Sequence, residues 1–211
     1  CQPPQKMLCN EFLENLRGFN KPGSFSYSVY ALLFLHLAGP AVLCNNNTFK
    51  CLDVFGFLNT IILSCFGSPL DDVFVFCTRG ELVRYRVPCL LEVYSQNGLR
   101  VHHVPFPDGC APELPQCCCI LEELQDCLQN QRKTVIHSYG GLGRSGLIAA
   151  CLLLQLSVAM TPSAALETLR ELRGGGAIQT IKQYNFLHEF REKFEAYQET
   201  KERLSERSVS R

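Results

Sequence analysis

Apolar residues after residue 70 fall into strand-length runs that alternate with helical stripes. The run over residues 73–77 is continuous and apolar, as expected for a strand covered on both faces. Thr78 and Glu81 form a capping-box pattern at the start of a helical stripe, which Asn97-Gly98 closes. A second strand-like run follows over residues 99–104. Together these segments predict a βαβ unit.

The rest of the chain adds helices around one more buried strand. In order, the pattern predicts a helix over 113–130, a strand over 134–136, a buried helix ending near 160, a helix from 161 that ends at 174–176, and a last helix from about 180 that fades into a charged tail over 201–211. This order of elements predicts a three-layer α/β domain over residues 71–200, in which helices flank a central, mostly parallel sheet.

Residues 1–70 show no sustained period of 2 or of 3.6, and we predict no fold for this segment. It contains two apolar stretches, over 29–44 and 55–66. Both are shorter than the roughly 20 apolar residues that a membrane-spanning helix needs. We therefore expect no membrane anchor.

Charge and cysteine content narrow the class of protein. Twenty basic residues balance twenty acidic ones, so no overall field favours nucleic acid or an acidic membrane as a partner. The thirteen cysteines are odd in number and include no C-x-x-C pair. We expect them to be reduced, core-filling thiols of an intracellular protein, and we expect neither a disulfide scaffold nor a zinc site.

A glycine-rich segment joins the strand over 134–136 to the buried helix after it. Strand, glycine-rich loop and helix start in this order make an anion site, because main-chain N–H groups point into the loop and the helix dipole adds positive potential. An arginine in the loop offers a planar fork that suits two phosphate oxygens. The segment reads His137-Ser138-Tyr139-Gly140-Gly141-Leu142-Gly143-Arg144-Ser145. A Walker-type nucleotide loop is the competing interpretation, but it requires a lysine that is missing here.

This segment resembles the signature of the protein-tyrosine and dual-specificity phosphatases, which is His-Cys, five residues, Arg, then Ser or Thr. One position departs from it, because Ser138 stands where the family has its nucleophilic cysteine. A cysteine at a helix start readily becomes a thiolate, whereas a serine hydroxyl is a much weaker acid. We therefore expect residues 138–144 to bind phosphate while most of the covalent chemistry is lost.

Asp108 lies in the turn-rich segment 105–109, which resembles the general-acid loop of the same family. The departing oxygen of a phosphate ester needs a proton, and a carboxylic acid on a movable loop can deliver it. The alternative interpretation is that Asp108-Gly109 is an ordinary turn pair. Because an anion loop is also present, we favour the general acid.

The resemblance assigns supporting roles to three polar residues. Gln179 resembles the glutamine that places water for the second, hydrolytic step, although Thr180 beside it also caps a predicted helix. His137 is expected to orient the loop; its alternative role is that of a satisfied buried histidine. Ser145 is expected to hydrogen-bond the attacking atom or to steady the loop, and it also lies at a helix start.

The resemblance is strongest to dual-specificity phosphatases that act on cyclin-dependent kinases, and it covers about residues 71–211 through the segments 74–81, 139–145 and 177–185. It implies removal of phosphate from phosphothreonine in the kinase activation loop, and so regulation of the cell cycle. It also implies a monomer that needs no metal or cofactor and works in the cytoplasm, the perinuclear region or the nucleus.

Two hypotheses remain open from the sequence. In the first, the chain is such an enzyme, and Ser138 leaves it in a substrate-holding form. In the second, it is a natural phosphoprotein-binding or kinase-sequestering protein that needs no turnover. The retained Asp108 favours the first hypothesis, because a pure binding protein has no use for a general acid.

Overall fold

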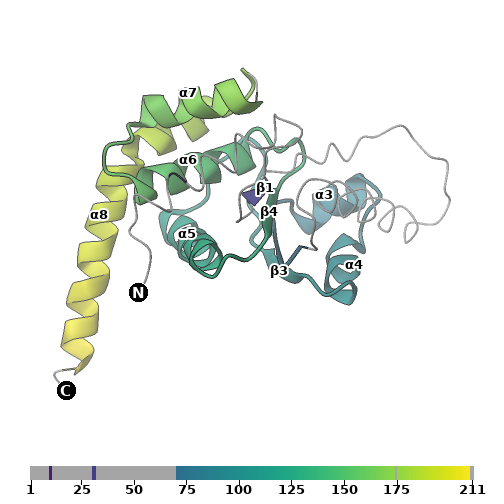
Figure 1. The fold of residues 1–211 in the computed structure, drawn as a ribbon, viewed down its shortest axis with the longest axis horizontal. Helices are drawn as coiled ribbons and strands as arrows, with labels where there is room; N and C mark the ends of the chain where they lie inside the picture. Colours follow the sequence, from purple (N-terminus) through teal and green to yellow (C-terminus); the bar gives the residue numbers. More distant parts are fainter. Residues whose placement is uncertain (1–9, 11–29, 32–69, 174, 210–211) are drawn as a thin grey trace.

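The computed structural model describes residues 10, 30–31, 70–173 and 175–209 (Figure 1). Within this part of the chain, parallel strands form one sheet in the order β1-β4-β2-β3. The strands are β1 (Tyr30–Ala31), β2 (Asp72–Val75), β3 (Arg100–His103) and β4 (Thr134–His137). Because each strand runs in the same direction, the carboxyl ends of β2, β3 and β4 meet at one edge of the sheet.

The predicted βαβ unit is confirmed. Two short helices occur where the sequence pattern predicted one helical stripe. These are α3 (Arg79–Arg84) and α4 (Leu90–Gln96). The capping box is present, because the Thr78 hydroxyl accepts from the Glu81 N–H at 3.2 Å and the Glu81 carboxylate accepts from the Thr78 N–H at 2.8 Å. α4 closes at Asn97-Gly98, as predicted.

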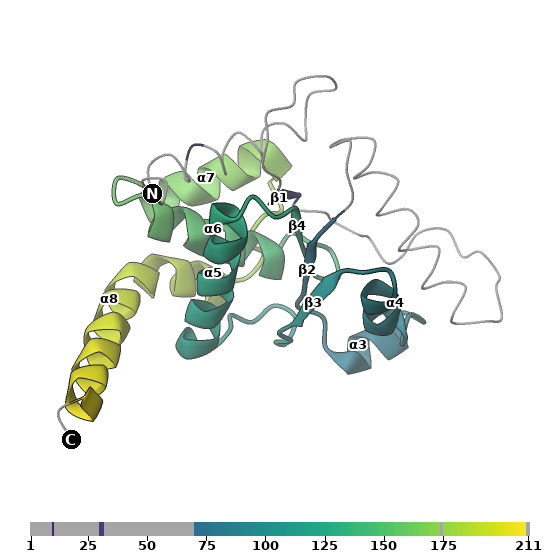
Figure 2. The same cartoon turned by 60° about the horizontal axis from the view of Figure 1, so that its bottom comes forward.

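Helices cover both faces of the sheet, which confirms the three-layer α/β fold (Figures 1 and 2). Alternate residues of β2 face opposite ways: Val73 and Val75 pack in the cluster with α3 and α4, whereas Phe74 packs in the cluster on the other face. The helices of that other face are α5 (Leu114–Gln129), α6 (Arg144–Leu156), α7 (Pro162–Arg173) and α8 (Ile181–Val209). Continuous apolar strands are required here because both faces are buried.

The helices after β3 follow the predicted order, with one earlier end. α5 matches the helix predicted over 113–130, and Glu113 and Asn130 are its caps. α6 ends at Leu156 rather than near residue 160, because the backbone is already extended at Ser157. The Arg191 guanidinium of α8 binds the main-chain carbonyls of this turn, which gives them partners outside the helix.

The last helix is longer than predicted. α8 continues to Val209, through most of the segment expected to be a charged tail. Oppositely charged side chains one turn apart lie along it, such as Lys193 and Glu189 at 2.6 Å. Lys201 also reaches Glu122 of α5 at 2.8 Å. These charge pairs allow a polar helix to extend beyond the domain core.

Little of the segment over 1–70 belongs to the described structure, so most of what was predicted there lies outside it. The exception is β1, whose Tyr30 pairs with Thr134 of β4. The apolar stretches over 29–44 and 55–66 fall outside the described residues apart from these strand positions. Among the helices that the structure describes, none combines the length and apolarity needed to cross a membrane.

Candidate active site

The predicted anion loop lies at the carboxyl edge of β4, directly before α6. His137 is the last residue of β4, and Arg144 is the first residue of α6. Gly143 is the N-cap of α6, and Gly141 has a φ of 65°. The predicted order of strand, glycine-rich loop and helix start is therefore confirmed. An anion at this position would face the positive end of the α6 dipole.

Ser138 is buried at the start of the loop, with 2% of its surface exposed. The Ser145 hydroxyl donates a hydrogen bond to Ser138 Oγ at 3.0 Å. Because Ser145 donates, it stabilises negative charge on the atom at position 138, which is useful to a thiolate or to an oxygen that is losing its proton. Ser145 was expected to hydrogen-bond the side chain at position 138 or to steady the loop, and the structure contains the first of these contacts.

Arg144 is buried, with 1% of its surface exposed, and one edge of its guanidinium is fully occupied. The Glu81 carboxylate accepts from Nη1 at 2.9 Å and from Nη2 at 2.7 Å. Nη1 also donates to the carbonyls of Phe76 and Phe106, each at 3.0 Å. These contacts fix the plane and rotation of the fork before any ligand arrives.

The opposite edge of the fork faces the predicted general acid. Arg144 Nε lies 3.3 Å from Asp108 Oδ1 and makes no hydrogen bond to the described residues. The Asp108 side chain remains 61% exposed. The structure therefore brings Asp108, Arg144 and Ser138 to the same edge of the sheet, although the first two are far apart in sequence.

Glu81 is a site residue that sequence reasoning assigned only to a helix cap. Burial alone would raise its pKa, but hydrogen bonds from Arg144 and Thr78 and the charge of Arg144 outweigh this and lower the pKa below its ordinary value. The carboxylate is thus ionised and paired with the buried arginine. The capping-box pattern locates Glu81, but no local pattern indicates its second partner 63 residues away.

His137 is fully buried at the end of β4, directly before the loop. Its Nε2 lies 3.3 Å from the Tyr94 hydroxyl, and the two rings meet edge to face. Burial lowers the pKa of His137 to about 4, so the imidazole is neutral at physiological pH. Tyr94 was predicted only as part of a helical stripe, and it supplies the partner that a buried histidine needs.

Gln179 lies against the loop, and its neighbour Gln183 shares the contact. A methyl group added at Gly143 would sit 2.8 Å from Gln179 Oε1 and 3.1 Å from Gln183 Nε2, so a side chain here would require these two amides to shift. The Gln179 N–H donates to Gln183 Oε1 at 3.0 Å. Gln183 is fully buried, and sequence reasoning quoted it within a matching segment without assigning it a role.

Tyr139 packs against the apolar cluster on the α3 and α4 face of the sheet, and its ring stacks on that of Tyr85. Their ring centroids are 4.1 Å apart and the rings are nearly parallel, at 12°. Tyr85 is the C-cap of α3, so this contact connects the anion loop to the helical layer that also carries Glu81. Stacked aromatic pairs are rigid, which favours a loop of fixed shape.

Cys77 is a buried thiol whose pKa is influenced by the positive charge of Arg144. Burial raises the pKa of Cys77 to about 12, even though Arg144 acts in the opposite direction. A thiol in that state is not a nucleophile at neutral pH. Cys77 is therefore no substitute for the nucleophilic cysteine that the family resemblance would place at position 138. The described cysteines are all free thiols.

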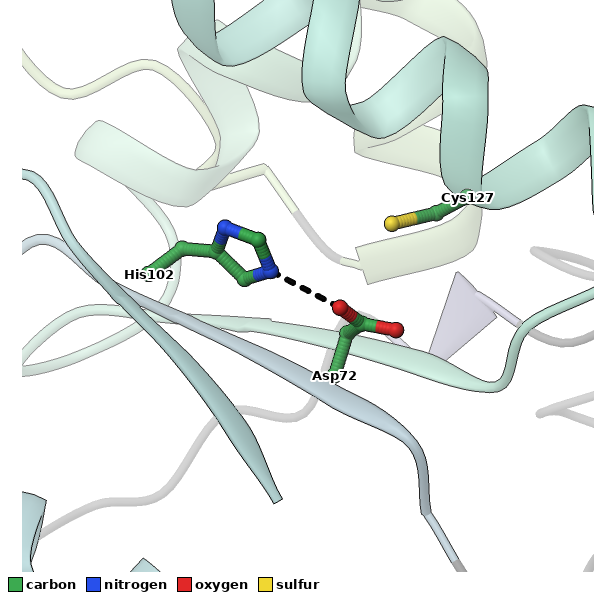
Figure 3. Close-up of side chains that lie close together, drawn as sticks. All are labelled: Asp72, His102 and Cys127. Atoms are coloured by element: carbon green, nitrogen blue, oxygen red, sulfur yellow. Dashed lines mark hydrogen bonds and ion pairs between the residues drawn. The ribbon is translucent and has the colours of Figure 1, made fainter. Parts of the chain in front are cut away.

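A second cluster of polar side chains lies at the start of β2, at the opposite edge of the sheet from the anion loop. Figure 3 shows Asp72, His102 and Cys127, whose ligand atoms lie within 4.8 Å of one another. Arg132 already occupies this cluster: its Nε lies 3.1 Å from Asp72 Oδ2, and its Nη2 donates to Cys127 Sγ at 3.0 Å. A metal ion would have to displace this guanidinium. We therefore interpret the cluster as an ion-pair network.

Comparison with known proteins shows which family the chain belongs to. The family model for cyclin-dependent kinase inhibitor 3 matches residues 41–166. This match starts earlier in the chain than the resemblance found in the sequence, which starts at about residue 71. Cyclin-dependent kinase inhibitor 3 of Sus scrofa is 64% identical over 142 residues, and that of Homo sapiens is 60% identical over 142 residues. Each match covers 67% of this chain and 66% of the relative, so the chain spans about two thirds of these proteins' length.

A solved structure agrees with this assignment. Kinase associated phosphatase, in a form whose catalytic-site cysteine is replaced by serine, is 44% identical to the chain with a TM-score of 0.62. The match covers 83% of this chain and 99% of that protein. The fold is that of the protein-tyrosine phosphatases, and the chain belongs to the cyclin-dependent kinase inhibitor 3 family.

Proposed function

We propose that the chain is a protein phosphatase of the dual-specificity type, acting on phosphothreonine in the activation loop of a cyclin-dependent kinase. We propose further that Ser138 leaves it in a severely impaired, substrate-holding form. The observation that carries both proposals is the 3.3 Å contact between Asp108 and Arg144 at the anion loop. The family membership and the kinase associated phosphatase relative support the kinase as partner.

Phosphate binding would rest on one edge of a fixed guanidinium. Glu81 holds the far edge of Arg144, so a phosphate dianion would bind at the Nε side, where it would take the place of the Asp108 carboxylate that lies 3.3 Å from Nε. The α6 dipole and the loop amides would share the remaining charge. Asp108 would give its proton to the ester oxygen that leaves.

The reaction has two steps when a thiolate stands at position 138. The thiolate attacks phosphorus, the bond from phosphorus to the threonine oxygen breaks, and Asp108 gives its proton to that oxygen. Water then attacks the phosphorus of the cysteinyl phosphate while Asp108 takes a proton from it, and the phosphorus–sulfur bond breaks, which releases inorganic phosphate and regenerates the thiolate. Gln179 would orient this water through its donor and its acceptor.

Ser138 impairs the reaction from its first step. Its Oγ already accepts a hydrogen bond from Ser145, and among the described residues no side chain accepts the Ser138 proton. His137 does not accept it either, because its Nε2 contacts Tyr94 and its Nδ1 makes no hydrogen bond to the described residues. An alcohol without a base attacks far more slowly than a thiolate. The bound phosphate ester would therefore persist.

Restoring the thiol tests the enzyme proposal. We expect the Ser138→Cys variant to release phosphate from a phosphothreonine activation-loop peptide, while the parent chain releases very little. In the Ser138→Cys background, Asp108→Asn should lower kcat by roughly 10²–10⁴-fold. Absence of turnover in the Ser138→Cys variant, with the fold intact by circular dichroism, would contradict the enzyme proposal.

The alternative function is capture of phosphorylated kinase without turnover, and the Ser145–Ser138 hydrogen bond is the observation that favours it. Under either function, Arg144→Ala should abolish capture of the phosphorylated kinase by the parent chain. Arg170→Ala is a matched control, because it removes one charge from the exposed face of α7. Capture that survives Arg144→Ala would mean that binding runs through another surface.

A further inference from the structure

The loop that carries Asp108 is fastened to the first turn of α8. The Thr180 hydroxyl donates to the Gly109 carbonyl at 2.7 Å, and Gln183 Nε2 donates to the Cys110 carbonyl at 3.3 Å. Both acceptors directly follow Asp108 in the chain. The contact is close, because a methyl group added at Gly109 would lie 3.3 Å from Thr180 Cγ2 and Gly109 has a φ of 72°.

The same turn also contacts the anion loop. Gln183 is fully buried, and its Oε1 accepts from the Gln179 N–H while its side chain packs on Gly143. A buried amide is stable only when its donors and acceptors are satisfied, so this side chain can adopt few positions. Residues 178–183 therefore lie between the acid-bearing loop and the phosphate-binding loop, with bonds to both.

Backbone strain marks this connection. Ile178 has a φ of 59°, in the left-handed region that a β-branched residue rarely occupies. Its N–H donates to the Leu142 carbonyl of the anion loop at 3.1 Å, and its side chain is buried. Such strain persists only where surrounding contacts hold it, and it occurs preferentially at functional sites.

We propose that Thr180 and Gln183 are positioning residues that dock the Asp108 loop against the anion loop, and thereby hold the general acid at the leaving oxygen. This inference rests on the proposed phosphatase function. Neither side chain needs to contact the substrate. Each acts through a carbonyl one or two residues after Asp108, so its loss would move the acid while Arg144 and position 138 stay in place.

The choice of substrate separates this role from a merely structural one. A threonine alkoxide is a strong base and cannot leave without a proton, whereas p-nitrophenolate is a weak base and leaves readily. In the Ser138→Cys background, Thr180→Val should lower kcat on a phosphothreonine peptide roughly tenfold, the worth of one good hydrogen bond. The loss on p-nitrophenyl phosphate should be less than about threefold, with KM unchanged on both substrates.

Three control variants isolate the donated hydrogen bond. Thr180 Oγ1 also accepts from the Gln183 N–H, so Thr180→Val removes a helix cap as well. Thr180→Asp keeps a capping acceptor but cannot donate to Gly109, and it should lose as much as Thr180→Val. Thr180→Ser keeps both hydrogen bonds, so its kcat should equal that of the Ser138→Cys background. Thr161→Val removes a cap from α7 through Ala164 and should leave kcat unchanged.

Amide hydrogen exchange of residues 106–111 supplies a readout that does not need activity. In the parent chain, Thr180→Val and Thr180→Asp should speed exchange in this loop, and Thr180→Ser should not. If exchange and the substrate-dependent loss of kcat are both unaffected by Thr180→Val, the docking role is wrong. If the Ser138→Cys variant has no activity, the proposed function fails, and the exchange experiment still decides the docking.

Discussion

Burial of Arg144 is the residue-level feature on which the proposed phosphate binding depends. A buried guanidinium is costly unless its donors are satisfied, and here Glu81, Phe76 and Phe106 accept from Nη1 and Nη2, whereas Nε makes no hydrogen bond to the described residues. The contacts also select which edge of the fork can accept a ligand. Lysine could carry the same charge, but it could not be held by one edge while presenting the other.

The neutral state of His137 gives a testable pH dependence at the same scale. Burial lowers its pKa to about 4 in the folded chain, whereas an unfolded histidine titrates near 6.5. Between these values the unfolded chain binds a proton that the folded chain does not. The free energy of unfolding should therefore fall as pH falls from 6.5 to 4, by up to about 3 kcal/mol from this residue.

Urea unfolding at several pH values measures this contribution. His137→Gln should flatten the pH dependence below 6.5, because glutamine does not titrate and can still bond Tyr94. His188→Gln is the control, since His188 is exposed on α8, and it should keep the slope of the parent chain. An unchanged slope in His137→Gln would mean that His137 titrates normally in the folded protein.

At the scale of elements, the end of α6 is decided by α8. Arg191 binds four carbonyls there: Nη2 donates to those of Leu154, Ser157 and Met160 at 2.8–3.0 Å, and Nη1 donates to that of Val158 at 3.2 Å. A positive charge at a helix carboxyl end is also favoured by the dipole. This single side chain therefore joins two helices of the layer that supports the anion loop.

Arg191→Ala should lower the free energy of unfolding by about 2–3 kcal/mol, because several carbonyls lose a charged donor at once. Arg191→Lys should recover only part of this loss, since an ammonium group cannot span the same carbonyls. Arg203→Ala removes an exposed one-turn pair with Glu199 and should cost less than about 0.5 kcal/mol. Chemical unfolding followed by circular dichroism measures each value, and equal values for Arg191→Ala and Arg203→Ala would contradict the capping role.

At the scale of the whole molecule, the two ends of the parallel strands carry different sets of polar residues. The carboxyl edge gathers the residues proposed to bind phosphate, whereas the start of β2 carries a network centred on buried Asp72. This carboxylate lies 2.8 Å from His102 Nε2, 3.1 Å from Arg132 Nε and 3.3 Å from Arg100 Nη2. The network connects β2, β3 and the segment before β4.

Asp72→Asn should destabilise the fold by about 3 kcal/mol or more, because the partly buried Arg132 guanidinium loses the fully buried carboxylate that pairs with it. Asp126→Asn is the matched control: Asp126 pairs with Arg132 from an exposed position and should cost less than about 1 kcal/mol. Thermal and urea unfolding compare the two. Similar losses in both variants would mean that the network does not stabilise the sheet.

Prediction from sequence succeeded where the signal is local. The buried strand, the glycine-rich loop and the start of α6 are adjacent in the chain, so their order is readable directly. The helix over 113–130 also follows from its apolar stripe. It failed for the end of α6 and the length of α8, because contacts between helices decide both, through Arg191 and Lys201.

The sequence by itself determined the alternation of strands and helices, the anion loop and the acid-bearing turn, since each depends on residues within a few positions of one another. Only the tertiary structure decided which groups hold them. Glu81 meets Arg144 across 63 residues, and Thr180 meets Gly109 across 71. Hydrophobic periodicity specifies which face of an element is buried, but a polar pair across elements depends on how the layers pack, and no period in the chain records that.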